Sequence, residues 1–132
     1  MVRNGQLAPI RLVIVDDHAA TRLGLRLRLT REPDLAVVGE TGDAAGGLHL
    51  ARRLRPDVVV VDLSLPDGDG IDFILQLRQI APGCRCLILS MDDSQHNRAR
   101  AAAAGITTFV GKQEPTEVLL AAIRREAVGS PT

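Results

Sequence analysis

Short apolar runs alternate with longer amphipathic stretches along most of this chain. The apolar runs are rich in β-branched residues and lie at residues 11–16, 35–40, 57–62, 86–90 and 106–110. Continuous runs of this kind are typical of strands buried on both faces of a parallel sheet. Helical patterns follow them at residues 19–31, 43–55, 69–81, 93–104 and 115–128. Five strand–helix units predict an α/β fold, a doubly wound domain with helices on both faces of the sheet.

Glycine and proline mark several of the predicted boundaries. Pro66, with Gly68 and Gly70, indicates a loop before the third helix. We expect Gly105 to lie directly after the fourth helix and to end it. Pro115 is expected to be the first residue of the fifth helix.

The first predicted helix contains a pattern that also fits a strand. Leu23, Leu25, Leu27 and Leu29 alternate with Gly and Arg, which is the period of a strand. A strand here would follow another strand without a helical crossover, and Arg is a good helix former, so we predict a helix. On that helix Leu25 and Leu29 face the sheet, while Leu23 and Leu27 project toward solvent. The second pair then either contacts another protein or is covered by packing within the domain.

Composition narrows the functions that such a domain can have. The chain has 132 residues, 45% hydrophobic and 24% charged, a balance typical of one soluble globular domain. Lys and Arg together number 16, as do Asp and Glu, so the net charge of zero argues against a strongly electrostatic nucleic-acid binder. With two Phe and no Tyr or Trp, the chain lacks the aromatic faces of base-stacking or flavin sites.

The chain ends carry no export or membrane signal. Residues 1–9 form an N-terminal leader without the apolar core of a signal peptide, and no run approaches the roughly 20 residues that cross a bilayer. We therefore expect a cytoplasmic protein that does not bind membranes. Its domain covers residues 10–128, and residues 129–132 form a tail or the start of a linker.

Cys84 and Cys86 are the only cysteines. Their spacing places both on one face of a strand, where the geometry of a mutual disulfide is unfavourable. We expect two buried, reduced thiols.

Polar side chains with distinct chemistry follow the predicted strands: Asp16 and Asp17, Asp62, Ser90 and Lys112. Ligands of open parallel sheets bind beyond the carboxyl ends of the strands, so these groups should converge on one edge. With the strand order 2-1-3-4-5, the three carboxylates would crowd together and favour a hard cation such as Mg²⁺. Lys112 is the only lysine beside fifteen arginines, and its long side chain can carry a compact positive charge back to Asp62.

Each of these residues also has a purely structural interpretation. An aspartate at a strand end often caps a helix, Ser90 can do the same, and Lys112 can be a solvated surface charge. Their joint position at four strand ends favours the functional interpretation. A second acidic group, Asp67, Asp69 and Asp72, is interpreted as loop and first-turn residues that suit a helix dipole, with metal binding as the lesser alternative. The three histidines share no ligand spacing and are not expected to be catalytic: His18, His49 and His96.

Four segments of the chain form a specific combination: VIVDDH (13–18), VVVVDLSLPDGDG (58–70), LILS (87–90) and TFVGK (108–112). Over about residues 10–128 the chain resembles the response-regulator receiver domain of bacterial two-component signalling. The DDH start, the stretch 32–40 and a lysine not followed by proline resemble its NarL/LuxR subgroup. The resemblance implies a flavodoxin-like (βα)5 fold with a five-stranded parallel sheet of order 2-1-3-4-5. It also implies control of transcription, through a helix-turn-helix DNA-binding domain that this chain does not contain.

The resemblance assigns a phosphorylation site to the acidic edge. Asp62 resembles the phosphoacceptor, whose carboxylate attacks the phosphoryl group of a phosphohistidine on a sensor histidine kinase. Asp17, Asp62 and the backbone carbonyl of Ser64 resemble the ligands of the cofactor Mg²⁺, and Asp16 resembles the outer acidic residue of that site. The domain is then no enzyme beyond catalysing its own phosphorylation and dephosphorylation.

Three further residues resemble the conformational switch of the family. Lys112 resembles the lysine that pairs with the phosphoryl oxygens, and Ser90 resembles the hydroxyl that moves to hydrogen-bond them. Phe109 resembles the aromatic residue that then turns inward. The implied partners are the kinase and a second copy in a homodimer, whereas the receiver itself is not expected to bind nucleic acid.

Three features depart from the family pattern. Met91 follows Ser90 where a small residue is usual, so its bulk could obstruct the phosphoryl site. Phe109 lacks the hydroxyl of the commoner Tyr, and the absence of proline directly after Lys112 implies no cis peptide there.

Other functions fit the sequence less well. A haloacid-dehalogenase-type phosphatase needs a second Asp two positions after its nucleophile, where this chain has Ser64. A flavodoxin-like FMN carrier needs a Ser/Thr-rich phosphate loop and aromatic residues. The main alternative is a degenerate or stand-alone receiver that acts as a protein-docking module without phosphorylation, which Met91 favours and the intact acidic edge opposes.

Overall fold

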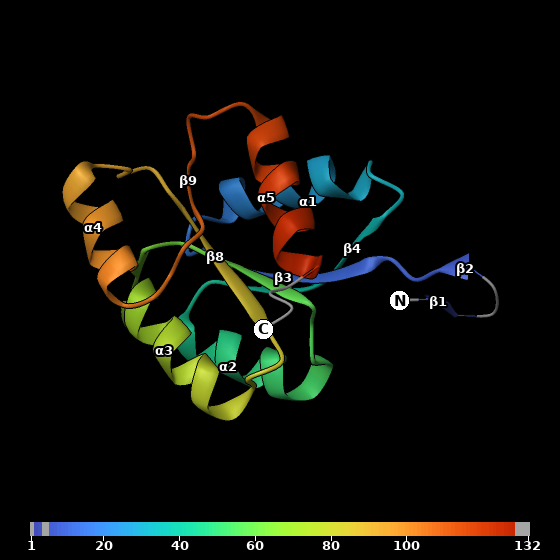
Figure 1. The fold of residues 1–132 in the computed structure, drawn as a ribbon, viewed down its shortest axis with the longest axis horizontal. Helices are drawn as coiled ribbons and strands as arrows, with labels where there is room; N and C mark the ends of the chain where they lie inside the picture. Colours follow the sequence, from blue (N-terminus) through green and yellow to red (C-terminus); the bar gives the residue numbers. More distant parts are fainter. Residues whose placement is uncertain (1, 4–5, 129–132) are drawn as a thin grey trace.

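The structure, a computed structural model, describes residues 2–3 and 6–128 and contains one five-stranded parallel sheet between two layers of helices (Figure 1). The sheet order is β4-β3-β5-β8-β9, which in chain order is 2-1-3-4-5 as predicted. Its strands are β3 (Ile10–Val15), β4 (Leu35–Thr41), β5 (Val58–Val61), β8 (Arg85–Ser90) and β9 (Phe109–Gly111). In β3, β5 and β8 all residues are buried except the first two of β3 and the first two of β8, as expected for a sheet covered on both faces.

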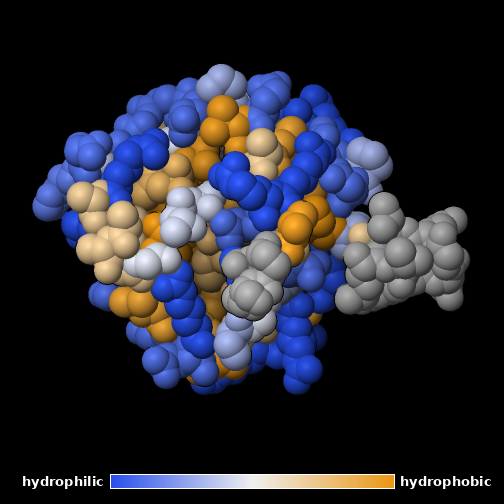
Figure 2. All heavy atoms as spheres, in the orientation of Figure 1, coloured by the Kyte–Doolittle hydropathy of each residue, from blue (hydrophilic) through white to orange (hydrophobic). Residues whose placement is uncertain are grey.

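The helices divide between the two faces. Side chains on one face of the strands, such as Leu12 and Ile14, pack with α1 (Ala19–Thr30) and α5 (Thr116–Val128). Their neighbours on the other face, such as Val13 and Val15, pack with α2 (Ala44–Leu54), α3 (Gly70–Ile80) and α4 (Gln95–Ala103). Because side chains alternate along a strand, each strand contributes residues to two separate cores. Apolar side chains reach the surface in the view of Figure 2 only in small areas among polar ones.

The helix boundaries lie within two residues of the predicted ranges, but the last strand does not. It was predicted at 106–110 and is found at Phe109–Gly111. Gly105 has φ +78° and ends α4 as predicted, and the next amide, that of Ile106, donates back to the carbonyl of Ala101 at 2.9 Å. The helix cap therefore uses the amide of Ile106, the first residue of the predicted strand, and β9 begins at Phe109.

Two short hairpins lie outside the main sheet. β1 (Val2–Arg3) pairs with β2 (Gln6–Leu7) in the predicted leader, and β6 (Ser64–Leu65) pairs with β7 (Gly68–Asp69) after the third strand of the sheet. The predicted tail, residues 129–132, lies outside the described residues. In the part of the chain that the structure describes, no helix is long and apolar enough to cross a membrane.

The leucines of α1 lie as predicted. Leu29 is fully buried and Leu25 packs against the same core, whereas Leu23 and Leu27 are 46% and 59% exposed. Packing within the domain therefore does not cover the second pair.

The two cysteines are free thiols, but the prediction that both are buried is wrong. Cys84 precedes β8 and Cys86 is its second residue, and both keep partial exposure at the amino-terminal end of the strand. Burial raises the pKa of Cys86 to about 12, so its thiol is protonated at neutral pH.

Candidate functional site

The predicted strand-end residues gather at the carboxyl edge of the sheet. Asp16 and Asp17 directly follow β3, Asp62 directly follows β5, and Lys112 directly follows β9. β3 and β5 end side by side because they are parallel neighbours, with Val15 paired with Val61, and β9 ends on the same edge two strands away from β5. Asp16 and Asp62 are 1% and 6% exposed, so two carboxylates are buried within one small region.

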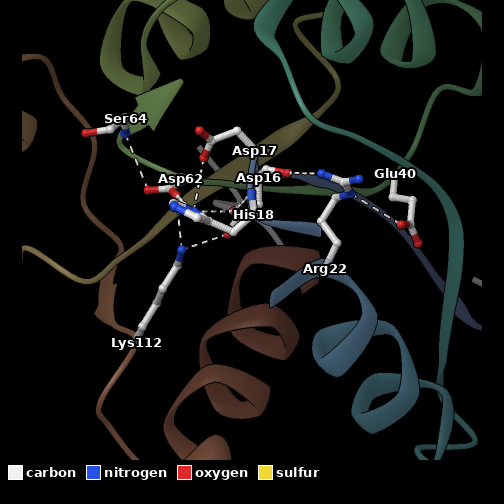
Figure 3. A network of polar contacts seen from close by, with 8 residues as sticks. All are labelled: Asp16, Asp17, His18, Arg22, Glu40, Asp62, Ser64 and Lys112. Atoms are coloured by element: carbon white, nitrogen blue, oxygen red, sulfur yellow. Dashed lines mark hydrogen bonds and ion pairs between the residues drawn. The ribbon is translucent and has the colours of Figure 1, made fainter. Parts of the chain in front are cut away.

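Lys112 bridges the two buried carboxylates (Figure 3). Its Nζ lies 2.7 Å from Oδ2 of Asp16 and 3.0 Å from Oδ2 of Asp62. The sequence predicted the contact with Asp62 but not the one with Asp16. Burial on its own would lower the pKa of Lys112, but hydrogen bonds to Asp16 and Asp62 outweigh it and leave that pKa above its ordinary value. The ammonium is therefore a permanent positive charge at neutral pH.

Four donor groups at this edge are close enough to hold one metal ion. Atoms of Asp16, Asp17, His18 and Asp62 lie within 4.8 Å of one another. Three carboxylates face the single ammonium of Lys112, so the cluster has excess negative charge that a cation would neutralise. Carboxylate oxygens are the ligands that hard divalent cations prefer.

His18 is a member of this cluster that sequence reasoning set aside. Its Nδ1 lies 3.1 Å from Oδ1 of Asp17, 3.3 Å from Oδ1 of Asp16 and 3.9 Å from Oδ2 of Asp62. The ring is 67% exposed, more than any of the three carboxylates of the cluster. Its position directly after the two aspartates was the available signal, which a search for ligand spacing among histidines could not detect.

A second layer of polar contacts fixes the loop after β3. Arg22 of α1 donates from Nη1 to the carbonyl of Asp16 at 2.5 Å, and from Nε to Glu40 at 3.4 Å (Figure 3). Oδ1 of Asp16 also accepts the backbone N–H of His18 at 2.9 Å. Sequence reasoning missed Arg22 and Glu40, because their contact joins α1 to β4 and no local pattern encodes it.

Ser90 and Phe109 lie on the β8 and β9 side of the site. Ser90 is 3% exposed, and its hydroxyl oxygen accepts the backbone N–H of Asp92 at 3.1 Å. Phe109 is partly buried, and the guanidinium carbon of Arg98 stands 4.9 Å from the centre of its ring. Arg98 also donates to the carbonyl of Phe109 at 3.1 Å, so α4 holds this residue through both ring and backbone.

The loop after Asp62 packs closely against that residue. The N–H of Ser64 donates to Oδ1 of Asp62 at 3.3 Å. A Cβ added at Gly70 would lie 2.4 Å from the carbonyl oxygen of Asp62, so only glycine fits there.

Two aspartates of the second acidic group cap helices. Asp69 caps the helix that directly follows it, α3, in agreement with the first-turn interpretation. Asp67 instead caps α2, a helix that precedes it in the chain.

The side chain of Met91 is exposed to solvent. It is 59% exposed and lines a hollow of about 380 Å³ between α1 and α5, together with Lys112. The side chain thus has open space beside it.

Comparisons with known proteins agree with this geometry. A family model described as the response regulator receiver domain matches residues 12–124. The chain is 36% identical over 125 residues to the nitrate/nitrite response regulator protein NarP of Escherichia coli, covering 95% of this chain and 58% of that protein. It is 37% identical over 120 residues to the DNA-binding transcriptional activator DevR/DosR of Mycobacterium tuberculosis, covering 91% and 55% respectively. The chain thus spans little more than half the length of these curated relatives.

A solved structure shows the same likeness. The crystal structure of a LuxR-family two-component response regulator from Aurantimonas sp. is similar with a TM-score of 0.86 and 35% sequence identity. The match covers 92% of this chain and 87% of that one.

Proposed function

Because this chain belongs to the family of response regulator receiver domains, of the NarL/LuxR type, we propose that Asp62 accepts a phosphoryl group from a phosphohistidine on a sensor histidine kinase. Residues 10–128 form this receiver domain. The observation that carries the proposal is the convergence of Asp16, Asp62 and Lys112 at the sheet edge, with the lysine in contact with both carboxylates.

The acidic cluster fits a magnesium ion. Asp17 and Asp62, with the backbone carbonyl of Ser64, would hold it, and Asp16 would act from outside through water. The three carboxylates supply hard oxygen donors and an excess of negative charge, which supports this assignment. When bound, Mg²⁺ neutralises phosphoryl oxygens during transfer.

The protein's own groups then position the reaction and read its outcome. Asp62 attacks the phosphorus atom with one carboxylate oxygen while the kinase histidine leaves, and an acyl phosphate forms. Lys112, held between Asp16 and Asp62, exchanges its contact with Asp62 for the new phosphoryl oxygens. Among the described residues the Ser90 hydroxyl accepts the N–H of Asp92 and donates to no group, so its O–H can donate to the phosphoryl group.

The switch would pass from Ser90 to Phe109 and on to the surface of α4, β9 and α5. A phosphoryl group adds charge and acceptor oxygens beside Ser90 and Lys112 and so favours one arrangement of this loop region. Phe109 then leaves Arg98 and turns inward. The output is control of transcription by a DNA-binding domain outside this chain, with a homodimer as the assembled form, and the receiver itself does not contact nucleic acid.

Phosphorylation by acetyl phosphate tests the proposal. With Mg²⁺, intact-mass spectrometry is expected to show one added phosphoryl group on the wild-type protein. No addition is expected after chelation of Mg²⁺ or in Asp62→Asn. Asp57→Asn, at the opposite end of β5, is a matched control that should react like the wild type. A wild-type protein that takes up no phosphoryl group would favour the docking module instead.

A further inference from the structure

The N-terminus of α2 is capped by a residue from a distant loop. Asp67 accepts hydrogen bonds from the backbone N–H groups of Ala44 at 2.8 Å and Ala45 at 3.0 Å, one on each carboxylate oxygen. The helix already has a local cap, because Asp43 accepts the N–H of Gly46 at 2.7 Å. Asp67 therefore does more than complete a local capping pattern: it ties two separate segments together.

Asp67 stands at the tip of the hairpin that follows the phosphoacceptor. β6 and β7 have two residues each, and Pro66 and Asp67 form the turn between them. Ser64, the first residue of β6, donates its N–H to the Asp62 carboxylate. The same hairpin therefore touches the phosphoacceptor at one end and the N-terminus of α2 at the other.

On the β7 side of the hairpin, Asp69 is held by other contacts. Oδ1 of Asp69 accepts the N–H of Ile71 at 2.7 Å, and Oδ2 pairs with Arg100 of α4 at 2.7 Å. At the tip of the hairpin, the carboxylate of Asp67 connects the turn to α2. So short a ladder adds little rigidity of its own, because two residues per strand form few hydrogen bonds.

From these contacts we infer that Asp67 is a positioning residue for the magnesium site: by fixing the hairpin to α2, it fixes the carbonyl of Ser64. The inference rests on the proposed function in taking that carbonyl as a Mg²⁺ ligand. Both oxygens of Asp67 are engaged by α2, so the residue acts through the hairpin and does not touch the cation. Groups behind metal ligands commonly set affinity in this way.

Magnesium binding, followed by amide NMR shifts on the unphosphorylated protein, tests this inference. Asp67→Ala removes both acceptors, and Asp67→Asn keeps one. Asp72→Asn, exposed in the first turn of α3, makes the same charge change without touching α2 and serves as the control. Amide exchange at Ala44 and Ala45 reports directly on the lost cap.

The expected result is graded. In Asp67→Ala, exchange at Ala44 and Ala45 accelerates and the Mg²⁺ dissociation constant rises roughly tenfold. Asp67→Asn shows a smaller rise, and Asp72→Asn matches the wild type. Phosphorylation of the two Asp67 variants needs more Mg²⁺ for half its maximal rate but reaches a limiting rate within about twofold of the wild type.

Two results would overturn the inference. One is faster exchange at Ala44 and Ala45 with an unchanged Mg²⁺ dissociation constant, which would leave Asp67 a helix cap only. The other is a wild-type protein that binds no Mg²⁺. If the wild type binds Mg²⁺ and Asp67→Ala weakens it while Asp62 takes up no phosphoryl group, the inference holds and the proposed function fails.

Discussion

At the residue scale, the site depends on one compact cation placed between two buried carboxylates. Lys112 is the only lysine of the chain, and its Nζ contacts Asp16 and Asp62 at once. A planar guanidinium of the kind found at fifteen other positions would present a broader, fixed set of donors in the same space. The single lysine therefore fits the proposed function, in which a phosphoryl group enters between Lys112 and Asp62.

Replacing Lys112 should separate phosphorylation from its conformational consequence. In Lys112→Ala the protein should keep its fold and bind Mg²⁺, but the β9–α5 region should no longer respond to phosphorylation. Lys112→Arg should also be impaired, because its fork cannot reproduce a point charge. Hydrogen exchange before and after acetyl phosphate treatment measures the response, and a full response in both variants would contradict the role given to Lys112.

Residues at strand ends were predictable because the sheet topology alone brings them together. Asp16, Asp62 and Lys112 follow apolar runs that read plainly as strands, and parallel order puts the ends of such runs on one edge. The contacts of Arg22 with Glu40 depend on side-chain packing between α1 and β4, which no periodicity expresses. The position of His18 follows from the turn of the chain after β3.

At the scale of elements, the leucines of α1 fit both a strand and a helix in their spacing, and the structure has the helix. Its leucines alternate as in a strand, yet the helix buries Leu25 and Leu29 and leaves Leu23 and Leu27 exposed. Exposed apolar side chains beside arginine are typical of a contact surface between proteins. The predicted start of β9 was wrong, and the α4 cap takes the amide of Ile106, the first residue of the predicted run. The β6–β7 hairpin escaped prediction because two-residue strands carry no period.

The exposed leucine pair can be changed with little effect on stability. Leu23→Glu with Leu27→Lys should leave the thermal midpoint within a few degrees, since surface changes usually cost under ~0.5 kcal/mol. Leu29→Ala on the same helix should cost about 2–5 kcal/mol, because it empties a buried site. The double variant should weaken kinase docking or self-association, measured by binding assays and sedimentation. Unfolding of the double variant would show that the pair belongs to the core.

The ion pairs between the α1–β4 loop and α5 should make the free energy of unfolding depend on pH in the acidic range. Hydrogen bonds from Arg28 and Arg124 lower the pKa of Glu32 below its ordinary value of 4.5, and Arg124 lowers that of Asp34 below 3.8. A lowered folded-state pKa stabilises the protein above the ordinary values, and this contribution is lost as pH falls through the lowered ones. The free energy of unfolding should therefore decrease below about pH 4.5, from urea titrations at several pH values.

Arg124→Gln is the matched control for this acid dependence. It should reduce the decrease in the free energy of unfolding between neutral pH and pH 3. High salt should narrow the difference between variant and wild type, because Arg124 and Asp34 are exposed and Glu32 is partly exposed. An identical pH profile for both proteins at low salt would contradict the assigned cause.

At the scale of the whole molecule, the apolar cores and the charged site occupy different parts of the parallel sheet. Its two faces are filled by separate apolar cores, and its carboxyl edge carries the charged residues. The fold class and the site edge followed from the alternation of strands and helices in the sequence. The strand order was implied by the resemblance to receiver domains, because periodicity alone does not fix it.

The most direct test of the account is to locate the phosphoryl group itself. Reduction of the phosphorylated protein with borohydride converts an aspartyl phosphate to homoserine, which tandem mass spectrometry of peptides can place at one residue. The account predicts homoserine at residue 62, only in samples treated with acetyl phosphate and Mg²⁺. Homoserine at Asp16 or Asp17 instead, or a phosphoryl group found on a hydroxyl or imidazole side chain, would contradict it.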